Sequence, residues 1–206
     1  MMKSNIVKIL LACVICMAAF GTSCILEDKV VQIVFTDKTS AEFNENSQDE
    51  HFLTTVVVDY ADQIDDILAD NDIDRDSIET AIVVSASYGV TSFTQDGDWE
   101  ITGTILVDRQ DISIAQDTLI KYTRQSIRDA LGRKIPAQLH PGGVGILNQA
   151  LAQYVAGTHN PVIEFTVDNG DVEPDPSPTN PIVFGWKTWL VIQVILTETF
   201  EVPDPF

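Results

Sequence analysis

The chain has 206 residues, of which 31 are acidic and 12 are Lys or Arg, and its formal net charge is −19. A chain with this charge repels nucleic acid and anionic lipid headgroups, and its basic residues do not cluster, so we expect no nucleic-acid partner. The only cysteines are Cys13, Cys16 and Cys24. The rest of the chain therefore has no disulfide and no thiolate metal site, and its fold depends on a hydrophobic core.

Residues 1–23 have the three-part layout of a secretory signal peptide. Lys3 and Lys8 precede an apolar run, ILLACVICMAAFG, and the small residues Thr22 and Ser23 follow it. The run is too short and wrongly flanked for a membrane span, which needs about 20 apolar residues. This segment holds the two lysines and no acid, so its removal changes the net charge from −19 to −21.

The small residues before Cys24 resemble the lipobox of bacterial lipoproteins, although Gly21 stands where that motif usually has Leu or Val. The resemblance implies that Cys24 is the lipidated first residue of the mature chain, at the outer membrane or cell surface of a bacterial envelope. Glu27 and Asp28 are similar to the acidic tag that directs some lipoproteins to the surface. Cleavage after Gly21 by the ordinary signal peptidase is the alternative, and it predicts a secreted or periplasmic protein.

We expect residues 24–50 to form a tether and a first strand, and residues 51–206 to form a single α+β domain. The first half of the chain has the periodicities of several strands and one short helix. The expected strands are 30–35, 53–58, 82–93 and 99–108, and the expected helix is 61–69.

The pair Asp96-Gly97 stands between two runs of alternating apolar residues, which is typical of a β-hairpin. We therefore expect strands 82–93 and 99–108 to pair with each other. The expected inward faces are Ile82, Val84, Ala86, Tyr88 and Val90 on the first strand, and Trp99, Ile101, Gly103, Ile105 and Val107 on the second.

Helices and then strands are expected in the second half of the chain. Apolar residues at helical spacing predict helices over 118–131 and 144–155. Strands follow at 163–168 and 184–202, and the proline-rich loop 173–181 between them cannot join a sheet. The last strand is long and apolar, so we expect it to be central and either bent or shared between two sheets. The expected fold class is α+β, a mainly antiparallel β-sandwich or curved sheet of about six strands with two or three inserted helices.

The stretch LADNDIDRDSIE at 68–79 has acids at every second position, Asp70, Asp72, Asp74 and Asp76. It fits no EF-hand, because no register places glycine and glutamate where that loop needs them. Calcium also accepts looser sets of oxygens, and the hairpin would bring Asp108 and Asp111 to the same end. A calcium-dependent adhesion module is therefore one hypothesis. The other interpretation is a solvated connection, in which Asp74 or Asp76 bonds to nearby backbone N–H groups.

No catalytic motif stands out in the sequence. His51, His140 and His159 lie in separate segments, without a second histidine at metal-ligand spacing. Ser85 and Ser87 lie inside an expected strand, and no G-x-S-x-G motif occurs. We therefore expect no enzyme, and no cofactor other than the calcium considered above.

Two further hypotheses for function remain. The first is an exported, lipid-anchored envelope protein with a non-catalytic binding or structural role, held to the membrane through Cys24 and bound to another envelope protein. The alternative is a carrier of an apolar or lipid ligand, in a groove between the helices and the last strand. The segment LNQALAQY and the later Pro161 are similar to a helix-to-strand junction in tubular lipid-binding lipoproteins. The groove would be lined by Leu147, Leu151, Tyr154 and Trp189; the other interpretation of this helix stripe is core packing.

Overall fold

The computed structural model describes residues 29–109, 115–158 and 162–200, with side chains from residue 39 to residue 196 of these ranges. The strands are β1 (Lys29–Ser47), β2 (Phe52–Asp59), β3 (Ile78–Phe93), β4 (Glu100–Arg109), β5 (Asp117–Ser126), β6 (Ile135–Ala137), β7 (Val162–Glu173) and β8 (Ile182–Phe200). The helices are α2 (Tyr60–Asp70), α3 (Ile127–Ala130), α4 (Pro141–Val155) and a 3-10 helix, η1 (Arg75–Ser77). All of these, except the outer ends of β1 and β8, belong to one compact unit, Gln32–Glu198.

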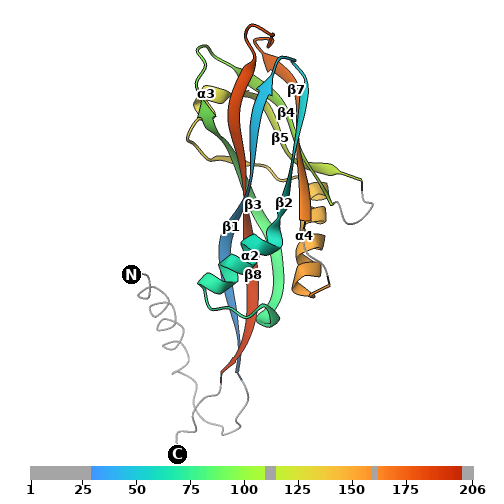
Figure 1. Cartoon of the computed structure of the whole chain (residues 1–206). Coiled ribbons are helices and arrows are strands. Elements are labelled where there is room, and N and C mark those ends of the chain that lie inside the picture. The colour runs from blue at the N-terminus through green and yellow to red at the C-terminus, as the bar shows by residue number, and fades with distance from the viewer. Residues whose placement is uncertain (1–28, 110–114, 159–161, 201–206) are drawn as a thin grey trace, which may run out of the picture. The chain divides into compact units, whose positions relative to one another are not determined.

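Two four-stranded antiparallel sheets pack together in this unit (Figure 1). Sheet A has the strand order β1-β8-β3-β6, and sheet B has the order β2-β7-β4-β5. The expected α+β class with a β-sandwich is confirmed, although the described residues hold more than the six or so strands that we expected. β8 lies between β1 and β3, so its central position is also confirmed, but it pairs within sheet A alone.

The predicted hairpin does not form, although both of its strands do. β3 pairs with β6 and β8 in sheet A, whereas β4 pairs with β5 and β7 in sheet B. Residues 94–99 therefore cross from sheet A to sheet B. The predicted tight turn would have kept the two strands paired in one sheet. Gln95 ties this crossing to the start of β8, because its side chain donates to Pro181 O and accepts from Val183 N. Trp99 then enters the core, where it is 1% exposed.

The predicted helix over 118–131 is wrong for most of its length. Residues Asp117–Ser126 form β5, an edge strand of sheet B, and only Ile127–Ala130 are helical. Residues such as Thr118, Ile120 and Tyr122 are β-branched or aromatic and fit a strand, and pairing with β4 outweighs the helical spacing of a few apolar side chains.

A β-bulge changes which residues of β3 face the core. Between Val83 and Ser85 the register with β8 shifts, so that β3 carries one extra residue there. The buried hydrophobic residues of β3 are Ile78, Ala81 and Val83 before the bulge, and Ala86, Tyr88 and Val90 after it. The predicted inward positions of Ile82 and Val84 are therefore wrong, and Val84 is 42% exposed.

The other predicted elements form with somewhat different bounds. α2 and α4 occupy the places of the helices expected at 61–69 and 144–155, and β7 extends the strand expected at 163–168. β1 continues through the polar stretch after residue 35, so Ala41 and Phe43 contribute to the core. In the described part of the chain, no helix is long and apolar enough to cross a membrane.

Candidate functional site

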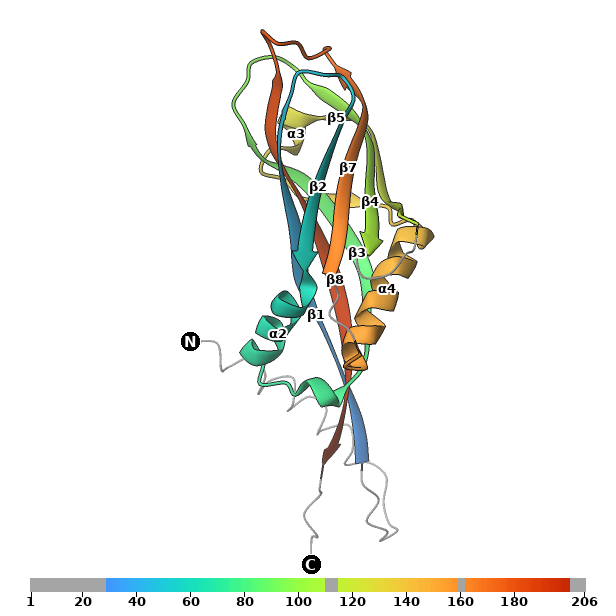
Figure 2. The ribbon, with the colours of Figure 1, turned by 45° about the vertical axis from the view of Figure 1, so that its right-hand side comes forward.

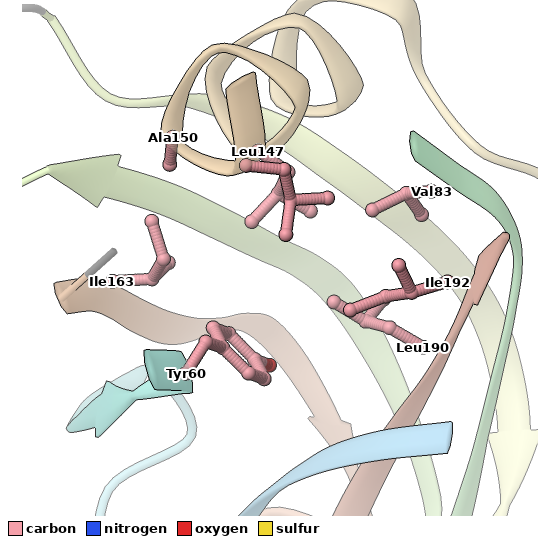
Figure 3. Close-up of a pocket in the computed structure, with 8 residues that line it drawn as sticks. Tyr60, Val83, Leu147, Ala150, Ile163, Leu190 and Ile192 are labelled. Atoms are coloured by element: carbon pink, nitrogen blue, oxygen red, sulfur yellow. The ribbon is translucent and has the colours of Figure 1, made fainter. Parts of the chain in front are cut away.

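The groove predicted beside α4 is filled by side chains. Leu147, Leu151 and Tyr154 are each at most 4% exposed. Figure 3 shows Leu147 directed from α4 toward the side chains of Ile163, Tyr60 and Val83. The cavity that remains here has a volume of about 10 Å³, which holds one water molecule at most. The stripe on α4 is therefore core packing, and the predicted second wall of the groove, the helix over 118–131, is absent.

Tyr154 joins α4 to α2 and to the acidic connection after it. Its hydroxyl donates to Asp65 of α2, and the Arg75 guanidinium carbon lies 3.8 Å from the centre of its ring. Burial, followed by the bond to Asp65, raises the pKa of Tyr154 to about 12. These contacts fix the end of α4 in place, and they give Tyr154 a structural role.

Trp189 does not lie with the other predicted groove residues. It sits half-buried on β8, next in sequence to Leu190, which faces the core. The Lys134 ammonium lies 4.5 Å from the centre of the Trp189 ring. This cation–π contact occupies the outward-facing ring and needs no ligand.

The acidic connection makes local turn bonds. The Asp74 side chain accepts from Asp76 N (3.1 Å) and caps η1. Among the described residues, no group of three or more His, Cys, Asp or Glu side chains is placed to hold a metal ion. Asp108, near the end of β4, belongs to no such group. Asp111 lies outside the described residues, as do Cys24 and His159.

A buried polar cluster lies in the core of the sandwich, and sequence reasoning missed it. Glu45 of β1 is 4% exposed; one of its carboxylate oxygens accepts from Thr54 of β2, and the other is buried without a hydrogen-bond partner among the described residues. Tyr122 of β5 donates to Asn169 of β7, and the Trp186 ring lies 5.4 Å from the Tyr122 ring. Burial raises the pKa of Glu45 and that of Tyr122.

This cluster cannot meet a substrate from solution, because Tyr122 and Asn169 are at most 3% exposed. Its role is therefore within the fold. The alternation of Thr39, Ala41, Phe43 and Glu45 along a strand is the signal that could have revealed Glu45 as an inward residue.

Most sheet edges in the described part of the chain are covered by other segments. The Gln63 side chain of α2 accepts from Ser40 N (3.1 Å) on β1, the outer strand of sheet A. Asn148 of α4 accepts from Val83 N (2.8 Å) at the bulge of β3. On β5, the carbonyl of Leu119 accepts from His140 N (2.9 Å). Such coverage removes unpaired backbone groups that would otherwise pair with another chain.

β2 is the exception. It is the outer strand of sheet B, beside β7 (Figure 2), and among the described residues no backbone group on its outer edge is bonded to another element. All its residues are half-buried or exposed; Leu53 is 62% and Val57 47% exposed on the same face. Its sequence, FLTTVVVD, has no proline or glycine and no charge before Asp59.

This composition is unusual for a free edge. Exposed edge strands are normally protected by lysine, proline, a bulge or a covering segment. β2 has no lysine, proline or bulge, and β1, which runs beside it in Figure 2, contacts it through the Glu45 and Thr54 side chains without pairing with it. Two acidic residues of β7, Glu164 and Asp168, stand opposite Val57 and Leu53, so for residues 52–58 the nearest charges across the sheet lie one strand further in. The outer edge of β2 is therefore the candidate functional site.

Comparisons of the sequence with protein-family models and with curated proteins found no match.

Proposed function

We propose that this chain is an exported, lipid-anchored protein of the bacterial cell envelope with a non-catalytic binding role. It binds its partner by adding a strand to sheet B at the outer edge of β2. The signal-like segment 1–23 and the small residues before Cys24 support export and anchoring. The observation that carries the binding role is the unpaired outer edge of β2, which has no charged residue at 52–58.

Strand addition fits this edge for two physical reasons. A partner strand bonds to the backbone groups that β2 directs away from β7, which gives affinity without depending on particular side chains. Its own side chains then cover Leu53 and Val57, which are now exposed to water. An edge with this composition would also cause aggregation if it stayed free, so a partner at this edge protects the protein as well.

Photo-cross-linking in the cells that produce the chain tests this proposal. A photoreactive phenylalanine derivative replaces Val57 in one version of the full chain and Val84 in a control version. Val84 is a matched control, because it is 42% exposed, close to the 47% of Val57, but lies on sheet A. We expect a discrete adduct from position 57 and none from position 84. Absence of an adduct at 57, or equal adducts at both positions, contradicts the proposal.

A further inference from the structure

We propose that the strand added at β2 is β2 of a second copy of this chain, antiparallel, with Thr55 opposite Thr55 of the other copy. This inference rests on the proposed function, because it names the partner of the same edge. Two identical edges that meet across a two-fold axis form a closed, isologous contact, which is the commonest geometry of protein dimers. The two B sheets would then join into one continuous antiparallel sheet.

The sequence of β2 is complementary to itself in this register. On the outward face, Leu53 of one copy would stand opposite Val57 of the other, with the two Thr55 side chains between these pairs. On the inward face, the pairs are Phe52 with Val58 and Thr54 with Val56. Each of these six residues meets an apolar or a β-branched side chain, which are the favourable cross-strand pairs of a sheet.

The charges at the ends of β2 agree with the same register. His51 of one copy would stand opposite Asp59 of the other, at both ends of the paired segment. No carboxylate is therefore placed directly opposite another carboxylate, an arrangement that would destabilise the pair. Between these ends, residues 52–58 bring no charge into the contact.

Repulsion between two chains of net charge −19 is the main cost of this contact. Apart from Asp59, which would face His51, the nearest acids on the outward face are Glu164 and Asp168 of β7, so three strand spacings separate them from the same residues of the other copy. That distance is about 14 Å, longer than the screening length of about 8 Å at physiological salt. Added salt screens the remaining repulsion, so we expect the dimer to bind more tightly as the salt concentration rises. Binding to a basic partner would instead become weaker, because salt would screen the attraction.

Disulfide cross-linking measures the register directly. Replacing Cys13, Cys16 and Cys24 by serine in the full chain, together with Thr55→Cys, leaves one thiol. In the proposed pair, the two residues at position 55 have Cα atoms about 5 Å apart, within the range of a disulfide. Mild oxidation should therefore convert most of the chain into a covalent dimer. Val84→Cys in the same background is the control, and it should stay monomeric.

A second pair of variants keeps the test decisive if Thr55→Cys perturbs folding. Leu53→Cys alone should cross-link poorly, because the two copies of position 53 are offset by about 13 Å along the strands. A mixture of Leu53→Cys and Val57→Cys chains should form the mixed disulfide at least several-fold more efficiently than either variant alone. Equal cross-linking in all combinations would overturn the proposed register.

The outcomes separate this inference from the function on which it rests. A position-57 photo-adduct with twice the mass of the chain, together with the register-specific disulfides, supports both. A position-57 adduct of another mass, with no disulfide dimer, overturns the self-pairing and keeps strand addition at β2. No adduct at position 57 and no disulfide overturns both.

Discussion

At the scale of the single residue, the buried carboxyl of Glu45 gives the stability of the sandwich a dependence on pH. Burial raises its pKa in the folded chain, so the folded state binds the proton more tightly than the unfolded state does. This contribution to stability is fully present below the ordinary glutamate pKa and is lost as pH rises through the raised folded value.

Glu45→Gln should remove this pH-dependent loss of stability, because the amide side chain stays uncharged at every pH. We expect the free energy of unfolding of the variant to fall less than that of the native chain between about pH 4 and pH 8. Urea unfolding across that range measures it. Glu42→Gln is the control, since Glu42 is on the same strand with a side chain 52% exposed, and it should follow the native chain. Parallel curves for all three proteins would contradict the assignment.

At the scale of the element, Asn148 shows how a helix protects a sheet edge. Its side chain accepts from Val83 N at the bulge of β3, where the ladder with β8 is interrupted. Asn148→Ala leaves that N–H without its partner, so we expect a loss of about 1–3 kcal/mol in the free energy of unfolding. Faster amide exchange at Val83 should accompany it. Gln149→Ala, at the adjacent exposed position on α4, is the control and should change little.

Two elements also show where sequence periodicity fails. Residues 82–93 and 99–108 alternate as strands should, and both are strands, but local alternation carries no information about which sheet each one joins. The length of the connection and the burial of Trp99 decide that. In 118–131, a few apolar residues at helical spacing predicted a helix, and pairing with β4 made a strand. Tertiary pairing overrides local preference most easily where, as here, β-branched residues are frequent.

At the scale of the whole molecule, the sequence was sufficient for the α+β class, for most of the core face of β4, and for the presence of α2 and α4. It was not sufficient for the site. The uncharged run at 53–58 was recognised as a strand, but only the sheet order places it at an unpaired edge. The predicted ligand groove beside α4 was wrong, because an apolar stripe such as Leu147 and Leu151 is as typical of a packed core as of a ligand site. Both residues are buried. The role of Cys24 stays a prediction.

The most direct test of the central claim is the mass of the full chain in solution, measured by sedimentation equilibrium over a range of concentrations. The native chain should be in reversible monomer–dimer equilibrium, with a dissociation constant that falls as salt rises from about 0.05 to 0.5 M. Val57→Lys places a charge on the edge and should be monomeric throughout with unchanged stability, whereas Val84→Lys should behave as the native chain. A native chain that is monomeric at every concentration, or a dimer that survives Val57→Lys, would contradict the claim that β2 pairs with its own copy.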